Sequence, residues 1–375
     1  MEFALPAALG LALLTLVPVG VVAVPMLDPD PEIWQHLWRH VLPELLVNTL
    51  WLALGVAIGV TVLGTGLAWL TAACEFPGRR FFTWALLLPL ALPAYVTAFV
   101  WIGLLDFTGA VPTWLRETWG IAWLPPIRSR GGVIAVMVLA LYPYVYLTAR
   151  TAFQGQGRRL TEAAQSLGLS RWRAFFQVAL PMARPGIMAG LTLALMETLA
   201  DFGTVAVFNY NTFTTAIYQA WFSMFSLPAA SQLATILVFF VLALVMLEQL
   251  SRAGSRYATP ARGSGGSGRI RLRGVHGALA TAAAALVFLL ACLVPLAQLG
   301  VWAWGVMDND LDARYLDFAW HSLLLAAVGA GLVITLALAL GYAQRLRPTP
   351  AMQFTTRLAT LGYALPGAVL AVGFY

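Results

Sequence analysis

Nine long apolar stretches decide what this chain can fold into, since each is long enough to cross about 30 Å of hydrocarbon. They lie near residues 7–25, 45–73, 81–105, 131–149, 186–208, 232–250, 278–306, 320–343 and 356–375. Inside lipid the backbone must satisfy its own hydrogen bonds, which favours a helix for every stretch. With 60% hydrophobic and 10% charged residues, the 375-residue chain is too apolar for a soluble domain. The sequence predicts an all-α polytopic membrane protein in contact with membrane lipid.

The arginines predict the orientation of these spans. The chain has 22 basic residues and no lysine. With a cytoplasmic N-terminus, five arginines fall in outer segments, and these are Arg39, Arg116, Arg128, Arg130 and Arg314. The other 17 fall in inner loops, in agreement with the rule that cytoplasmic loops carry the excess of basic residues.

The absence of lysine also excludes one kind of ATP-binding site in this chain. A P-loop of the G-x4-G-K-[ST] type is impossible, so any ATP that powers this protein must bind to another chain. Cys74 and Cys292 form neither a disulfide framework nor a metal motif. No catalytic constellation is found, so we expect a non-catalytic chain without a bound cofactor. We expect no nucleic-acid partner, and the sequence assigns no metal ligand.

The most informative polar segment lies at 158–186, between two predicted spans on the inner side. Together with Arg150 it holds six arginines and a single acid, Glu162. It reads as two short amphipathic helices, with Thr161 as a possible N-cap and Gly168 at the break. Such a segment is either a docking surface for a cytoplasmic partner or an amphipathic helix that lies on anionic lipid.

The spacing within this segment resembles the E-A-A-x3-G-x9-I-x-L-P loop of binding-protein-dependent ABC importer permeases. The matching residues are Glu162, Ala163, Ala164, Gly168, Val178, Leu180 and Pro181, with Val178 where isoleucine is usual. The resemblance implies the type I permease fold in a bacterial inner membrane. It also implies that these residues couple the chain to a cytoplasmic ABC ATPase dimer, which hydrolyses ATP, and that a periplasmic substrate-binding protein delivers the cargo.

Residues 251–276 are rich in glycine, serine and arginine and predict a flexible cytoplasmic linker. A shift of 273 residues places Asn48 on His321 and Ala91-Leu92-Pro93 on Ala364-Leu365-Pro366. We interpret this as a tandem duplication, a common transporter architecture. The expected organisation is then a first span with a periplasmic segment at 1–44, a first half at 45–250 and an incomplete second half at 277–375. Nine of an expected twelve spans are present.

Two acids inside the fifth apolar stretch are candidates for the transport path. Glu197 and Asp201 are one helical turn apart, so they are expected to share a helix face. Carboxylates in hydrocarbon are costly and by default mark a pathway or a helix contact. They either line the route and favour a cationic cargo, together with Tyr142 and Tyr146, or are structural acids bonded to those tyrosines.

The stretch M-E-T-L-A-D-F-G-T-V-A-V-F, followed by T-F-T-T-A-I-Y-Q-A-W-F-S-M-F, resembles the fused ferric-iron importer permeases. It is less similar to the thiamine, sulfate and polyamine branches. The resemblance implies passage of Fe(III), with Glu197 and Asp201 exposed to the iron path. The alternatives are a permease for another solute of these branches, or an ion-coupled secondary transporter that needs no ATPase.

Overall fold

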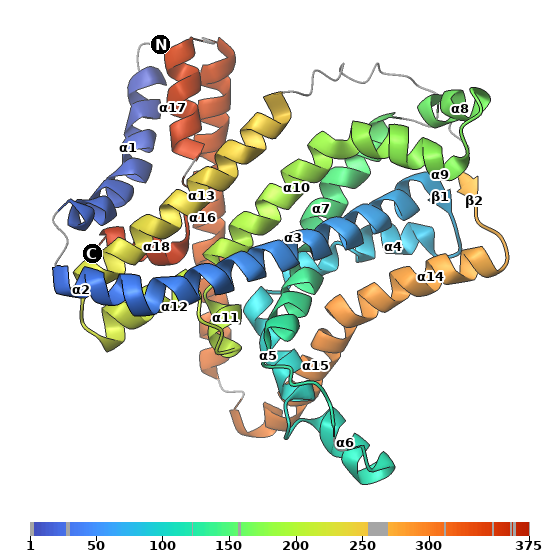
Figure 1. Ribbon diagram of the computed structural model, residues 1–375, viewed down its shortest axis with the longest axis horizontal. Coiled ribbons are helices and arrows are strands. Elements are labelled where there is room, and N and C mark those ends of the chain that lie inside the picture. Colours follow the sequence, from blue (N-terminus) through green and yellow to red (C-terminus); the bar gives the residue numbers. More distant parts are fainter. Residues whose placement is uncertain are drawn as a thin grey trace.

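We analysed a computed structural model of the chain, which describes residues 4–27, 31–121, 123–156, 159–253, 269–310, 313–346, 349–360, 362 and 365–374. The predicted all-α membrane fold is confirmed (Figure 1), and the only strands in these ranges are two short ones. Most of the predicted linker, residues 254–268, lies outside the described residues, as do Arg158 and Ala364.

Residues 4–253 form a first set of helical elements and one short strand. These are α1 (Ala4–Ala23), η1 (Val24–Met26), α2 (Pro31–His36), η2 (Leu37–Val41), α3 (Leu42–Ala73), β1 (Cys74–Glu75), α4 (Arg79–Ala85), η3 (Leu88–Ala91), α5 (Ala94–Leu105), α6 (Ala110–Trp119), α7 (Arg130–Gln156), α8 (Arg159–Ser166), α9 (Arg171–Ala174), η4 (Phe175–Ala179), α10 (Leu180–Ala200), α11 (Gly203–Val207), α12 (Phe213–Tyr218), η5 (Gln219–Ser223) and α13 (Leu227–Ala253).

Residues 269–374 form the second set. These are β2 (Ile270–Arg271), α14 (Val275–Phe288), η6 (Leu289–Leu293), α15 (Val294–Asp310), α16 (Ala313–Leu346), α17 (Pro350–Thr360) and α18 (Gly367–Phe374). Segments η1 and η3 are 3-10 turns, whereas η2, η4, η5 and η6 are π-helical turns that continue into the flanking helices.

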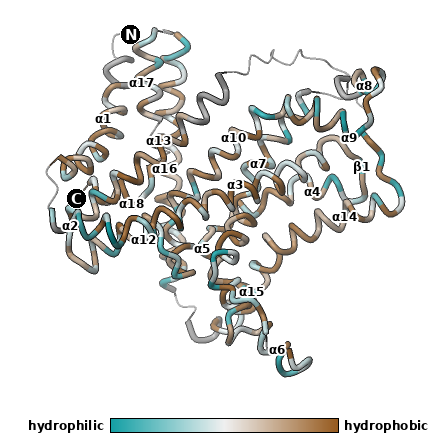
Figure 2. Tube along the Cα trace, viewed as in Figure 1, coloured by the Kyte–Doolittle hydropathy of each residue, from teal (hydrophilic) through white to brown (hydrophobic). Residues whose placement is uncertain are grey.

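Within the described ranges, eight helices are long and apolar enough to cross a membrane. They are Leu9–Met26, Trp34–Ala73, Ala94–Trp119, Arg130–Gly155, Arg171–Ala200, Leu227–Leu244, Val275–Val306 and Arg314–Leu346. Each corresponds to one of the first eight apolar stretches of the sequence. The ninth stretch does not form one long helix, because its residues belong to two short helices, α17 and α18. Figure 2 shows the hydrophobic colour along the long helices and the hydrophilic colour concentrated near α8, α9 and β1.

The secondary structure repeats with the offset of 273 residues that the sequence suggested. Helix α3 ends at Ala73 and α16 ends at Leu346, while α5 begins at Ala94 and α18 begins at Gly367. The third and ninth apolar stretches are therefore interrupted at equivalent places. Proline has no backbone N–H and restricts the residue before it, and Pro93 and Pro366 stand directly before the second helix of each interrupted stretch.

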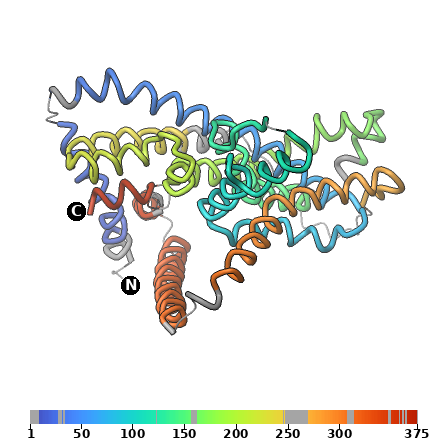
Figure 3. The backbone as a smooth tube through the Cα atoms, turned by 90° about the horizontal axis from the view of Figure 1, so that it is seen from below, coloured from blue at the N-terminus to red at the C-terminus, as the bar shows by residue number. Residues whose placement is uncertain are grey.

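The first helices of each set pack against helices of the other set. Helix α1 packs against α17 and α18, and in the same way α14 packs against α4 and α15 packs against α5. Figures 1 and 3 show both groups, one on each side of the central helices. In contrast, none of the α16 span is buried, and it stands away from the central bundle in Figure 3.

Glycines allow the central helices α3, α7 and α10 to approach closely. A Cβ on Gly64 would lie 2.9 Å from the Tyr142 carbonyl oxygen, and one on Gly190 would lie 2.6 Å from the Tyr144 carbonyl oxygen. Lipid tails are as apolar as the helices, so helix association in a membrane depends on such close packing of small residues. Gly66 shares α3 with Gly64, but a Cβ there would meet nothing within 4 Å.

The two α3 glycines provide a matched test of this packing. We expect Gly64→Leu to destabilise the folded chain by about 1–3 kcal/mol, because the added atoms overlap the α7 backbone. Gly66→Leu is expected to leave stability unchanged or slightly higher, since leucine favours helix over glycine. The thermal midpoint of the detergent-solubilised protein measures both effects, and equal midpoints for the two variants would contradict this packing.

Candidate coupling loop and intramembrane acidic residues

The segment at 158–186 folds as two short helices, the second of which continues into the membrane. Helix α8 ends in a turn, and α9, η4 and α10 then form one continuous helix over Arg171–Ala200. We call residues 159–181 the coupling loop, after the role that the sequence resemblance predicts for them. Its second part is the start of a membrane span, so any displacement of α9 is carried directly to α10.

Gly168 sits at the turn, as the sequence predicted. Its φ is +91°, a left-handed conformation that glycine adopts without steric cost. The Gly168 N–H donates to the Gln165 carbonyl at 3.0 Å, and the Leu169 N–H donates to the Ala164 carbonyl at 3.1 Å. This pair of bonds is a Schellman motif, which satisfies carbonyls at the end of α8.

The first helix of the coupling loop begins before Thr161, which the sequence offered as a possible N-cap. Helix α8 begins at Arg159, so Thr161 lies inside its first turn and is not its N-cap. The side chain that does cap a helix here is Ser170, whose oxygen accepts the Arg173 backbone N–H at the start of α9.

The motif residues of the coupling loop occupy two environments. Glu162 and Ala163 are exposed on α8, whereas Ala164 is 7% exposed. Val178 and Leu180 are half-buried where η4 passes into α10, and α8 packs against η4. The two halves of the motif therefore belong to one packed unit at the N-terminal end of the span Arg171–Ala200.

Large apolar side chains in the coupling loop face solvent, and sequence reasoning missed them. Leu167 is 86% exposed, Trp172 is 75% exposed and Phe176 is 58% exposed. The rings of Trp172 and Phe176 stack with centroids 6.4 Å apart. Trp172 and Phe176 are spaced i, i+4 among arginines. This spacing places both on one helix face and was the signal that the sequence offered.

Phe175, next to the exposed Phe176, packs inward and holds the loop against the central helices. The Phe175 ring lies 4.7 Å from the Trp69 ring of α3, and Trp69 lies 5.2 Å from Phe153 of α7. Phe175 and Phe176 therefore point to different surroundings, one against the central helices and one outward. The loop is fixed to the same helices that the glycines hold together.

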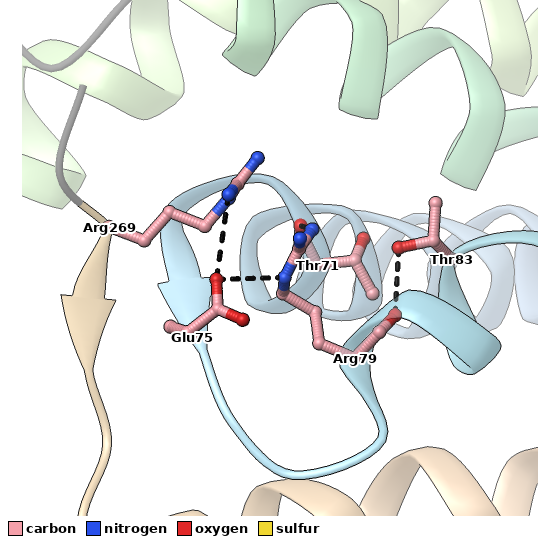
Figure 4. A network of polar contacts seen from close by, with 5 residues as sticks. All are labelled: Thr71, Glu75, Arg79, Thr83 and Arg269. Carbon is pink, nitrogen blue, oxygen red and sulfur yellow. Dashed lines mark hydrogen bonds and ion pairs between the residues drawn. The ribbon is translucent and has the colours of Figure 1, made fainter. Parts of the chain in front are cut away.

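Next to this anchor, the strand after the linker pairs with the C-terminal end of α3. Strand β2 runs parallel to β1, and the Leu272 N–H donates to the Glu75 carbonyl at 2.9 Å. Figure 4 shows Glu75 Oε2 accepting from Arg79 Nε at 3.0 Å and lying 3.5 Å from Arg269 Nη1. Burial raises the pKa of the Cys74 thiol in β1 to about 11, so it remains protonated at neutral pH.

Asp201 does not continue the helix of Glu197. Helix α10 ends at Ala200, and Asp201 has an extended backbone at its C-cap. Its carboxylate accepts the Thr204 N–H at 2.8 Å, the Thr204 hydroxyl at 2.9 Å and the Val205 N–H at 3.3 Å. Asp201 still stands one turn from Glu197, since its N–H donates to the Glu197 carbonyl at 2.9 Å, so the expected shared face stays a prediction. A negative side chain at the start of α11 is stabilising, so Asp201 has a structural role there.

Tyr142 and Tyr146 are fully buried, and their hydroxyl groups donate to backbone carbonyls. Tyr142 donates to Leu86 at 2.9 Å, and Tyr146 donates to Thr83 at 3.0 Å. These bonds attach α7 to the end of α4, because Thr83 lies in its last turn and Leu86 is its C-cap residue. The bonds that hold Asp201 go to Thr204 and Val205 and not to the tyrosines. Glu197 is half-buried in the last turn of α10.

Among the described residues, no three His, Cys, Asp or Glu side chains lie close enough together to hold a metal ion.

Comparison with known proteins relates the chain to membrane components of importers. Residues 64–253 match the family described as binding-protein-dependent transport system inner membrane component. The Fe(3+)-transport system permease protein FbpB 2 of Haemophilus influenzae is 29% identical over 316 residues, which is 83% of this chain and 58% of that protein. This chain thus spans less than two thirds of that relative.

Two further permease proteins match a shorter part of the chain. The molybdenum transport system permease protein ModB of Escherichia coli is 32% identical over 50% of this chain and 81% of its own length. The sulfate transport system permease protein CysT of Escherichia coli is 28% identical over 52% of this chain and 70% of its own length.

The fold also matches a solved structure, that of a bacterial ABC transporter involved in the import of the acidic polysaccharide alginate. The TM-score is 0.51 at 16% sequence identity, over 64% of this chain and 89% of the other. This likeness confirms the ABC permease fold and, with the family match, a multi-pass, non-catalytic membrane component. The chain belongs to the family of binding-protein-dependent transport system inner membrane components.

Proposed function

We propose that this chain is the permease of an ATP-driven importer and that its coupling loop docks on a separate cytoplasmic ATPase. The observation that supports docking is the exposure of Leu167, Trp172 and Phe176 on a loop that continues into a span. Buried apolar surface contributes roughly 25 cal/mol per Å², so a partner that covers these side chains is favoured. Tryptophan and arginine are also typical of the residues that dominate protein interfaces.

The same geometry supports a mechanism for force transmission. Closure of an ATPase dimer would move α8 and α9, and the continuous helix Arg171–Ala200 would carry that motion into the membrane. Helix α10 packs on α7 and α3, with Gly186 and Gly190 against the α7 backbone. Tightly packed helices move as a unit, since a dense interior transmits displacement. The helices would then rock between inward-open and outward-open states, with the N-terminus cytoplasmic.

Ferric iron delivered by a periplasmic binding protein is the cargo that we propose. The iron-transport relative aligns with 83% of this chain, including residues beyond the linker, and Glu197 supplies a carboxylate inside the fifth span. A half-buried acid favours a cation over an anion at that depth. Glu197 and Asp201 are the two acids that we propose for contact with the ion, and Glu197 is the one tested below.

An oxyanion cargo is the second candidate, since the molybdenum permease is 32% identical over 189 residues, against 29% over 316 residues for the iron-transport relative. The Glu197 carboxylate would repel molybdate or sulfate, which have the same sign of charge. Uptake measurements separate the two cargoes directly.

The docking proposal predicts the effect of a charge within the exposed apolar face. We expect Leu167→Asp to reduce recovery of a P-loop ATPase with the affinity-purified chain by about tenfold, because docking would bury the new carboxylate. Leu167→Met keeps an apolar side chain of similar size and is the matched control. Recovery of the ATPase by Leu167→Asp at the level of the control would contradict docking through this face. If the segment instead rests on lipid as an amphipathic helix, neither sample should contain the ATPase.

The cargo proposal predicts chain-dependent uptake of radioactive Fe(III) by cells, with no chain-dependent uptake of molybdate or sulfate. Glu197→Gln should lower the iron uptake rate by about tenfold, since it removes the charge but keeps the shape. Glu44→Gln, which removes an exposed acid bonded to Asn211, is expected to change uptake less than twofold. Uptake of an oxyanion in place of iron would overturn this cargo.

A further inference from the structure

A cavity of about 250 Å³ opens between the coupling loop and the strand that follows the linker. The coupling loop contributes Gln165, Arg171 and Phe175, strand β2 and the residue before it contribute Arg269 and Arg271, and α3 contributes Trp69. The cavity shares Arg269 with the ion-pair network of Figure 4, and the Trp69–Phe175 ring contact forms part of its wall.

The cavity concentrates positive charge. Three of its lining side chains are arginines from two distant parts of the chain, and its described lining includes no carboxylate. Glu75 Oε2 lies 3.5 Å from Arg269 Nη1 and also accepts from Arg79 Nε. One carboxylate shared by two guanidinium groups leaves the cavity with a net positive charge. Like charges held together destabilise the arrangement until an anion joins them.

The remaining lining groups suit a phosphoryl group. Arginine presents a planar fork of donors that matches phosphate oxygens in pairs, and the Gln165 amide adds a neutral donor. Trp69 and Phe175, with ring centroids 4.7 Å apart, form an apolar wall. A ligand with a phosphoryl group and a carbon skeleton would therefore contact both kinds of surface.

We propose that this cavity binds the phosphoryl group of an anionic ligand, either the headgroup of an anionic phospholipid or a soluble phosphate ester. Trp69 is four residues from the end of α3, which corresponds to about 6 Å along the helix, so the cavity lies near one end of a membrane span. A bound phosphoryl group would bridge Arg171 on the coupling loop to Arg269 and Arg271 ahead of α14. It would thereby join the coupling loop to the start of the second set of helices.

Binding is tested on the full chain, delipidated in neutral detergent and without any ATPase, so that the result is independent of the proposed function. Native mass spectrometry measures retention of added phosphatidylglycerol against phosphatidylcholine, and equilibrium dialysis measures binding of radioactive glycerol phosphate. We expect the double variant Arg171→Gln, Arg271→Gln to bind the phosphoryl probe about tenfold more weakly, since two charge-assisted contacts are lost.

The matched control is the double variant Arg173→Gln, Arg273→Gln. It removes the same charge from exposed neighbours two residues further along each segment, outside the cavity lining, and should weaken binding less than about twofold. Arg271→Lys keeps the charge but loses the fork, and an intermediate affinity supports paired recognition.

Binding of phosphatidylglycerol alone assigns a lipid headgroup, and binding of glycerol phosphate as well assigns the phosphoryl group by itself. Binding of neither probe, or equal losses in the two double variants, would overturn the proposal. An unchanged thermal midpoint of both ligand-free variants confirms that they are folded.

Discussion

The close approach of α3, α7 and α10 is the constraint on which the rest of the structure depends. Lipid supplies no hydrophobic force between helices, so contact at Gly64 and Gly190 must hold them together. The buried tyrosines of α7 fasten the end of α4 to this core, and Trp69 and Phe153 fasten the coupling loop through Phe175. A loop mounted on a tightly packed core can transmit displacement, whereas a loop on loosely packed helices would only bend.

The two sets of helices are also held together because the first helices of each set pack against the other set. Since α1 packs on α17 and α18 while α14 and α15 pack on α4 and α5, each set of helices is completed by a member of the other. The β1–β2 pair and the Glu75 network add a polar connection at the C-terminal end of α3. This connection lies beside the coupling loop, because Arg269 and Ile270 line the same cavity as Arg171 and Phe175. Motion of the loop can therefore reach the start of the second set of helices.

Much of this arrangement could be predicted from the sequence because its signals are local. Apolar length predicts spans, and the glycine at 168 predicts the turn, since both follow from the chemistry of adjacent residues. The departure of Asp201 from α10 could not be predicted, because its preference for capping α11 depends on Thr204 and Val205 after the helix ends. The pairing of β1 with β2 joins residues almost 200 positions apart, and no local pattern encodes it. The exposure of Trp172 likewise could not be predicted, because it depends on which face of the coupling loop packs against α3 and α7.

The central claim is that force enters this chain through the outward face of the coupling loop. The most direct measurement is cysteine cross-linking in inside-out membrane vesicles, with Trp172→Cys introduced after Cys74 and Cys292 are replaced by serine. The account predicts an adduct between this chain and a P-loop ATPase whose yield changes when ATP is added. Trp304→Cys, which is 78% exposed near the far end of the seventh span, should give none. Absence of the ATPase adduct at Trp172 in vesicles that transport the cargo would contradict the account.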